Sequence, residues 1–202
     1  MKIFCIGRNY LDHIKELNNA LPTKPLIFMK PPTALLIDNK PFYYPDFTQN
    51  LHHEIEIVIR ISKNGKAIEK EFAHRYYDKI GIGIDFTARD LQDELKDKGQ
   101  PWELAKGFDG SAVLSNLISI KEVDMSNIHF HLTKNGITVQ TGETKDLIFN
   151  FDTIIAYISK FFTLQQGDLI YTGTPAGVGA VVIGDKLEGF LEGKSMFNCD
   201  IK

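Results

Sequence analysis

Hydrophobic and polar residues alternate most regularly over residues 51–61, where isoleucine occupies every second position of the second half and mostly polar residues stand between. A period of two predicts a β-strand. Residues 77–86 repeat the pattern, with isoleucines that alternate with glycines. Residues 129–133 and 136–140 also alternate, and the Asn-Gly pair that begins at residue 135 predicts a hairpin between them.

Helices are predicted in three segments, residues 9–18, 87–98 and 152–162. The second segment opens with Thr87 and Asp90, which resemble a capping box, and it ends at Gly99. A second Asn-Gly pair, in residues 63–66, predicts a tight turn after the first strand. Residues 169–172 read as a short strand. Because strands predominate and do not alternate regularly with helices, we expect an α+β fold with mixed sheets.

Six of the eight prolines lie within residues 22–45. Proline at this density excludes a helix and fits extended edge segments and turns. An interdomain linker is the alternative interpretation. The apolar residues of this segment favour burial, so we assign residues 1–202 to a single catalytic domain.

The composition narrows the class of protein. The 202 residues include 23 Lys and Arg and 26 Asp and Glu, which gives a net charge of −3. Nothing resembles a basic stripe for nucleic acid, and no apolar run is long enough for a membrane span, so neither partner is expected. Cys5 and Cys199 stand at opposite ends of the chain and suggest no disulfide framework. We therefore expect a cytoplasmic protein.

Three carboxylates are the strongest candidates for chemistry. Glu54 and Glu56 are two residues apart on a predicted strand, so their side chains share a face. Asp85 stands at the end of the next strand. The plain alternatives are a solvated strand face for the glutamates and a helix cap for Asp85. A site built from all three would offer only hard oxygen ligands, which suit Mg²⁺ or Mn²⁺ rather than zinc.

His13 and Glu16 are three residues apart on a predicted helix and are therefore neighbours on its surface. A carboxylate that holds one imidazole nitrogen leaves the other basic enough to deprotonate water. An ordinary surface pair is the alternative. Lys106 follows Trp102 in a partly apolar stretch that continues to Gly107. That setting either draws the ammonium into a pocket or leaves it solvated.

Other candidates carry less weight. His52 shares the face of the two glutamates and is a weak candidate ligand, whereas His53 does not share it. We interpret His129 and His131 as structural. Residues 173–179 are rich in glycine but lack the Gly-Lys-Ser/Thr ending of a phosphate loop. Their glycines are expected to turn the chain sharply or to let the backbone approach a small anion.

Five segments in order resemble the fumarylacetoacetate hydrolase family, and within it the short acylpyruvate hydrolases. They are residues 6–13, 50–56, 85–92, 101–108 and 172–179. The resemblance implies a strand-rich mixed β-roll or barrel core with a few short helices, a lid within about residues 1–20, and a homodimer. Larger family members carry a further metal-binding Asp in an added N-terminal domain, for which this chain has no counterpart.

The resemblance also implies roles for ten side chains. The metal ligands would be Glu54, Glu56 and Asp85, the catalytic residues His13, Glu16 and Lys106, and the substrate-binding residues Arg8, Arg89, Gln92 and Thr174. The metal would be Mg²⁺ or Mn²⁺, and the substrate a small 2-oxo acid.

The implied reaction is hydrolysis of an acylpyruvate, a 2,4-dioxo acid such as acetylpyruvate or fumarylpyruvate, to pyruvate and a carboxylic acid. The metal would stabilise an enolate while His13 activates water. Three alternatives use the same site: decarboxylation of oxaloacetate, its keto–enol tautomerisation, and isomerisation of a 2-hydroxy-diene-dioate. A non-enzymatic module that binds an oxo acid or a metal is the alternative from another class.

Overall fold

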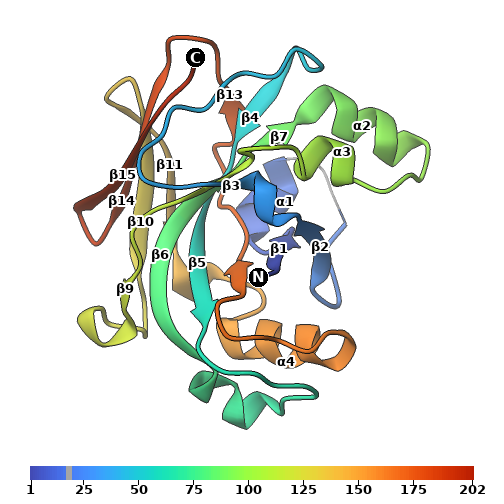
Figure 1. Ribbon diagram of the computed structural model, residues 1–202, viewed down its shortest axis with the longest axis vertical. Coiled ribbons are helices and arrows are strands. Elements are labelled where there is room, and N and C mark those ends of the chain that lie inside the picture. Colours follow the sequence, from blue (N-terminus) through green and yellow to red (C-terminus); the bar gives the residue numbers. More distant parts are fainter. Residues whose placement is uncertain (17–19) are drawn as a thin grey trace.

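The computed structural model describes residues 1–16 and 20–202. Strands predominate, as predicted, and the sheets curve around the core as a half-barrel (Figure 1). The α-helices of the described chain are α1 (Leu11–Glu16), α2 (Arg89–Asp97), α3 (Glu103–Lys106) and α4 (Phe151–Phe161). Short 3-10 helices occur at Pro32–Ala34, Lys70–Arg75, Ile120–Glu122 and Thr144–Asp146.

The largest sheet is mixed and crosses the middle of the molecule (Figure 1). Its strands follow the order β2-β1-β12-β5-β6-β8-β3, with β9 beside β6. β1 pairs in parallel with β12, as β3 does with β8, and the other neighbours are antiparallel. The bounds are β1 (Ile3–Gly7), β2 (Leu26–Lys30), β3 (Leu35–Leu36), β5 (Ile55–Ile61), β6 (Tyr77–Asp85), β8 (Ala112–Leu114), β9 (Ile118–Ser119) and β12 (Leu169–Tyr171).

The predicted strand over residues 51–61 is present but broken at Glu54. Its first part, β4 (Leu51–His53), belongs to a small sheet with β7 (Thr87–Ala88) and β13 (Gly179–Ala180). Its second part is β5, whose isoleucines lie opposite those of β6 and are fully buried. The chain thus changes sheets at Glu54, which is itself one of the predicted metal ligands.

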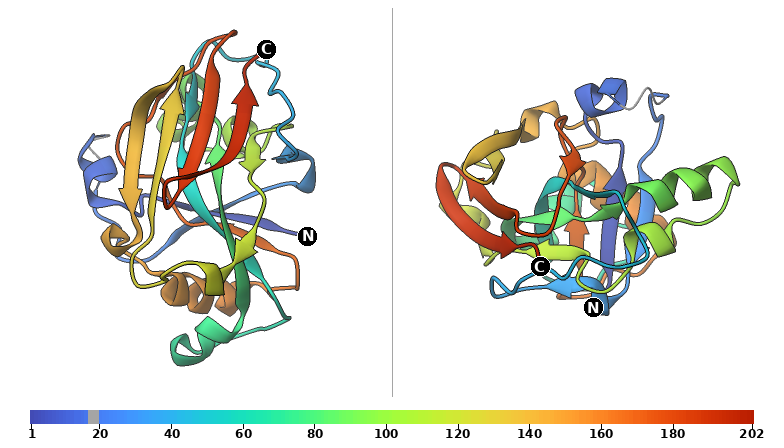
Figure 2. Two further views of the ribbon diagram at one scale, coloured as in Figure 1. Left: turned by 90° about the vertical axis from the view of Figure 1, so that its left-hand side faces the viewer. Right: turned by 90° about the horizontal axis from the view of Figure 1, so that it is seen from above.

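A four-stranded antiparallel sheet covers the isoleucine face of β5 and β6 (Figure 2, left). Its order is β11-β10-β14-β15, with bounds β10 (His129–Lys134), β11 (Ile137–Glu143), β14 (Lys186–Leu191) and β15 (Lys194–Asp200). Inward side chains such as Phe130 and Leu187 join the isoleucines in one apolar core. The predicted hairpin is confirmed, because Asn135 and Gly136 adopt the positive φ angles, 54° and 79°, of a tight turn.

The second Asn-Gly pair does not form the predicted tight turn. The backbone of Gly65 exchanges hydrogen bonds of 3.0 and 2.8 Å with Leu164, in the segment after α4. The connection from β5 to β6 then continues through the 3-10 helix Lys70–Arg75. The prediction was wrong because a partner about a hundred positions away, invisible to any local pattern, binds this backbone.

The start of α2 also differs from the prediction. Thr87 is part of β7, the helix begins at Arg89, and its N-cap residue Ala88 makes no side-chain cap. Asp90 instead accepts hydrogen bonds from the Thr48 hydroxyl at 2.5 Å and the Gln49 N–H at 2.8 Å. The capping box was therefore wrong, because a loop before β4 binds the carboxylate that was expected to close it.

The other two predicted helices are present. In α4, the Asn150 side chain caps the first turn by accepting from the Thr153 N–H, and the isoleucine face is buried. α1 begins at Leu11, and its predicted end at residue 18 lies outside the described residues. The proline-rich segment contributes β2 and β3 to the large sheet, as its apolar residues indicated. Within the described chain, no helix has the length and apolar character needed to cross a membrane.

Gly83 lets three strands of the large sheet approach closely. A Cβ at this position would overlap the Val113 carbonyl oxygen on β8 and would lie 2.7 Å from the ring of Tyr171 on β12. The Tyr171 hydroxyl donates to that same carbonyl at 2.7 Å. Neither group can move without breaking the bond between them, so this position requires glycine.

We expect Gly83→Ala to lower the free energy of unfolding by about 2 kcal/mol or more, because the added methyl overpacks a rigid region. Urea unfolding followed by circular dichroism measures it. Gly179→Ala is the matched control, since its Cβ would lie 3.4 Å from the nearest atom, and it should change stability by less than about 0.5 kcal/mol. Equal destabilisation by both substitutions would contradict this account.

Candidate active site and metal centre

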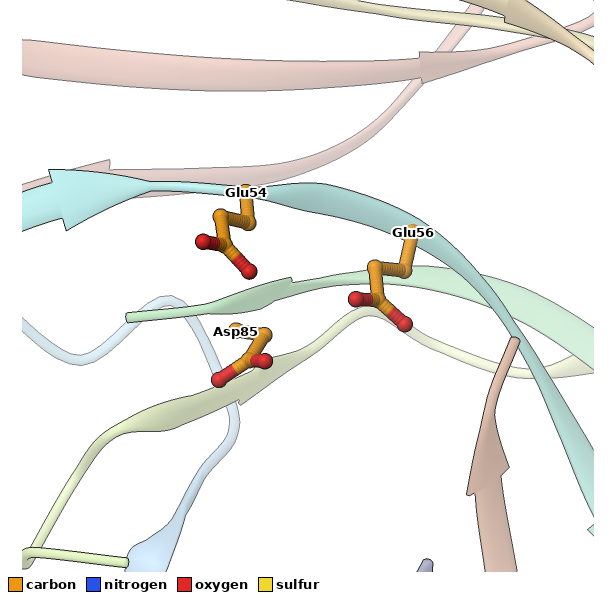
Figure 3. A group of neighbouring side chains, drawn as sticks. All are labelled: Glu54, Glu56 and Asp85. Carbon is orange, nitrogen blue, oxygen red and sulfur yellow. The ribbon is translucent and has the colours of Figure 1, made fainter. Parts of the chain in front are cut away.

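The three predicted metal ligands converge. Glu54 follows β4, Glu56 lies on β5 and Asp85 ends β6. The pairing of β5 with β6, extended by a 2.9 Å hydrogen bond from the Asp85 N–H to the Glu54 carbonyl, brings the three side chains to one face. One oxygen from each carboxylate lies within 4.8 Å of the others, and Figure 3 shows all three turned toward a common space. All three are buried, which excludes a solvated strand face.

Cations from two helices contact these carboxylates. Lys106, on α3, donates to Glu54 Oε2 at 2.8 Å and to Asp85 Oδ2 at 2.6 Å. Arg89, at the start of α2, pairs with Glu54 Oε1. Lys106 is only 3% exposed, so it is drawn into a pocket and not solvated.

The surrounding charges shift the pKa values of the two glutamates in opposite directions. Burial alone would raise the pKa of Glu54, but Lys106 and Arg89 hold that pKa well below its usual range. Burial and the negative charge of Asp85 raise the pKa of Glu56 well above its usual range, although the Gly173 N–H donates to it at 2.7 Å. Glu56 is therefore the carboxylate whose negative charge the protein compensates least.

A hard divalent cation fits this donor set. Lys30 Nζ pairs with Asp85 Oδ1 at 2.7 Å, and Lys106 and Arg89 pair with Asp85 or Glu54, whereas Glu56 forms no ion pair with a described residue. A buried glutamate of raised pKa that has no ion pair of its own offers negative charge that a cation would neutralise. Oxygen ligands without sulfur suit Mg²⁺ or Mn²⁺. Glu54, Glu56 and Asp85 would hold the ion.

His13 and Glu16 form a pair on α1 that faces the site. His13 Nδ1 lies 3.2 Å from Glu16 Oε2, and Glu16 Oε1 accepts from the Gly177 N–H at 3.0 Å. His13 is only 5% exposed, so the pair is not an ordinary surface pair. Because Glu16 engages Nδ1, Nε2 is the nitrogen left to face the cavity.

One cavity contains nearly all of the predicted site. It is lined by Arg8, His13, Arg89, Gln92, Lys106 and Thr174 together with the three carboxylates. Glu16 stands behind His13. Gln92 accepts from Arg89 at 2.6 Å and so also orients that guanidinium. Arg8 has a φ of 59°, which is strained for a non-glycine residue and turns the chain at the cavity rim.

The sequence pattern did not indicate several residues of the site, of which Lys30, which contacts Asp85 without lining the cavity, is the most consequential. It ends β2, is 1% exposed, and donates to the backbone carbonyls of Phe86 and Ser111 at 3.3 and 3.1 Å and to that of Lys106. It thereby fixes Asp85 and the backbone of Lys106 in place. No local signal distinguishes it from a solvated lysine. Lys96, Phe28 and Trp102 also line the cavity.

The histidine predictions are partly revised. His52 is half-buried and lies 3.4 Å from Arg89 Nε, and it is not in the acidic cluster. His53, which was given less weight, is fully buried and bonds Gln140 at 2.9 Å. Strand alternation failed here because the chain changes sheets after His53. His131 stacks on Phe190, consistent with a structural role.

The chain is similar over nearly its whole length to a family model and to named proteins. The family model described as fumarylacetoacetate (FAA) hydrolase C-terminal matches residues 2–202. The Bos taurus protein named mitochondrial oxaloacetate tautomerase FAHD1 is 42% identical over 192 residues, which cover 95% of this chain and 87% of that protein. The Escherichia coli K12 protein named oxaloacetate tautomerase YcgM is 41% identical over 197 residues, 96% of this chain and 90% of that protein.

A solved structure of fumarylpyruvate hydrolase from Pseudomonas aeruginosa, in complex with Mn²⁺ and pyruvate, has a TM-score of 0.94 and 34% identity. The match covers 100% of this chain and 89% of that one. Its Mn²⁺, together with the buried acidic cluster found here, supports a divalent metal in this fold. The half-barrel, the order of the motifs and the whole-chain match lead to one conclusion: this chain belongs to the fumarylacetoacetate hydrolase family.

Proposed function

We propose that this protein is a divalent-metal-dependent enzyme acting on small 2-oxo acids, and that keto–enol tautomerisation of oxaloacetate is its main reaction. The observation that carries the proposal is the buried cluster of Glu54, Glu56 and Asp85 beside His13 in one cavity. Relatives named oxaloacetate tautomerase, aligned over at least 95% of the chain, favour this reaction over the hydrolysis that the motifs first suggested.

The cavity suits an anion with two carboxylates. Arg8, Arg89 and Lys96 also line it. Burial, and after it the positive charge of Arg89, lower the pKa of Lys96, whose ion pair with Asp93 is long at 3.7 Å. Arg89 is engaged with Glu54, which leaves Arg8 and Lys96 for the distal carboxylate of a dioic acid such as oxaloacetate.

A bound Mg²⁺ or Mn²⁺ would supply a Lewis acid for the negative charge that develops on the keto oxygen. His13 Nε2 takes the proton from carbon 3 of the substrate, the electron pair of that C–H bond forms the double bond between carbons 2 and 3, and the carbonyl π pair moves onto the keto oxygen. Glu16 accepts from Nδ1 and so fixes the tautomer in which Nε2 is basic. Lys106, buried beside the acidic cluster, stabilises the developing charge and can donate a proton to the oxygen.

Hydrolysis of an acylpyruvate is the second candidate, because the His13–Glu16 pair also suits activation of water. Water deprotonated by His13 would attack the distal carbonyl, and the carbon–carbon bond would break to give a carboxylic acid and pyruvate. The similarity to a fumarylpyruvate hydrolase supports this reaction. A homodimer and a cytoplasmic location stay predictions.

Metal removal tests the proposal. Tautomerisation of oxaloacetate and hydrolysis of fumarylpyruvate are measured on one purified sample before and after exhaustive EDTA treatment. We expect tautomerisation to be the faster reaction, both to be lost with the metal, and both to return with Mg²⁺ or Mn²⁺. Tautomerisation that survives in demonstrably metal-free protein would refute the metal-dependent mechanism, and faster hydrolysis would make the second candidate the main one.

Two substitutions separate the roles of the residues. His13→Ala should lower kcat about 10²- to 10⁴-fold, the usual contribution of a general base, and leave Mn²⁺ affinity unchanged.

Glu56→Gln should weaken Mn²⁺ binding at least tenfold and lower activity, because it replaces a charged ligand with a neutral amide. Calorimetric titration with Mn²⁺ measures the affinity. His129→Ala, on an exposed strand position, is the control, and wild-type affinity in Glu56→Gln would reject the ligand assignment.

A further inference from the structure

Gln140 is a buried glutamine at an irregular point of β11. Leu132 of β10 lies opposite Gln140, but the next residue, Thr133, lies opposite Thr138, so Val139 is an extra residue in the strand. Such a bulge re-aims neighbouring side chains. Gln140 is 2% exposed, and its hydrogen bonds run to other parts of the molecule, the start of β5 and the glycine-rich loop.

Two backbone groups fix which end of the Gln140 amide is oxygen. The Ile55 N–H, which can only donate, lies 3.1 Å from Oε1. The Pro175 carbonyl, which can only accept, lies 3.0 Å from Nε2. Because the two groups agree, the amide has a single orientation that satisfies both. The same orientation makes His53 Nδ1, 2.9 Å from Oε1, the protonated nitrogen of that ring.

This orientation determines the polarity of the Thr174 hydroxyl. Gln140 Nε2 donates to Thr174 Oγ1 at 2.9 Å, so the hydroxyl oxygen is an acceptor in that bond. A hydroxyl has one proton, and that proton takes no part in the hydrogen bond with Gln140. Thr174 is 3% exposed and lines the cavity that holds the acidic cluster. The proton is therefore available to a ligand there.

We propose that Gln140 is a positioning residue that keeps the Thr174 hydroxyl as a hydrogen-bond donor to the carboxylate of a bound 2-oxo acid. The inference rests on the proposed function for the identity of that ligand. Gln140 does not line the cavity and acts only through Thr174. The competing explanation is that Gln140 merely holds the loop, whose neighbouring Gly173 N–H bonds Glu56. In that case its loss would disturb the acidic cluster as well.

A double-mutant cycle distinguishes the two explanations. Pyruvate binding in saturating Mg²⁺ is measured by calorimetry for the wild type, Gln140→Met, Thr174→Val and the double variant. We expect each single substitution to weaken binding about tenfold, the usual loss for a hydrogen bond to a charged group. The double variant should bind at most about twofold more weakly than Thr174→Val, because both substitutions remove the same bond. Mn²⁺ affinity should stay unchanged throughout.

Losses that multiply to about a hundredfold, or weaker Mn²⁺ binding in Gln140→Met, would overturn the positioning role and leave the proposed function intact. A wild type that binds neither pyruvate nor any other oxo acid and turns none over would overturn both. Thr141→Val, at the adjacent exposed position of β11, is the control and should bind pyruvate as the wild type does.

Gln140→Glu provides a second variant that preserves the shape of the side chain. It keeps an acceptor for the Ile55 N–H and the His53 ring but replaces the donor that faces Thr174. At pH 8 the carboxylate should accept a hydrogen bond from the Thr174 hydroxyl, which then no longer donates to the ligand. Pyruvate affinity should therefore fall at least as far as in Gln140→Met. In turnover, KM should rise with little change in kcat, since the lost bond is made to substrate and transition state alike. Wild-type affinity in this variant would refute the proposal.

Discussion

The burial of three carboxylates around one point is the constraint on which the rest of the site depends. Like charges removed from water repel each other and lose hydration, so the fold must place positive charges or hydrogen-bond donors beside them. Lys30, Lys106 and Arg89 do so from three separate elements, yet the compensation is uneven. The pKa of Glu56, which forms no ion pair with a described residue, stays raised by burial and by the negative charge of Asp85. This residual negative charge is what a divalent cation would neutralise.

The site forms where the chain leaves one sheet for another. Glu54 marks the break between β4 and β5, Asp85 ends β6 just before β7, and the glycine-rich loop joins β12 to β13. In each of these segments the regular pairing of strands is interrupted, so side chains or backbone N–H groups can point toward the cavity. The large sheet holds their flanks, while α1 places His13 in the cavity wall with Glu16 bound to its Nδ1. In the proposed reaction, the acidic cluster that would hold the metal and the histidine that would take the proton thus come from separate elements.

The sequence predicted what short-range patterns determine. Alternating isoleucines predicted β5 and β6, the Asn135-Gly136 pair predicted its hairpin, and spacing placed Glu54 beside Glu56. Long-range partners determined the rest. Gly65 pairs with Leu164 instead of turning, and the buried states of Lys30 and Gln140 depend on backbone groups far away in the chain. Motif order supplied the family and the cavity residues, but an isolated polar residue in a strand carries no local sign that it will be buried.

The central claim is that one divalent cation is held by Glu54, Glu56 and Asp85. Anomalous diffraction at the manganese edge, from crystals of the intact protein grown with Mn²⁺, tests it most directly. The account predicts a single strong peak about 2.1 Å from an oxygen of each of the three carboxylates. A cavity without a peak at saturating Mn²⁺, or a peak coordinated by other residues, would contradict it.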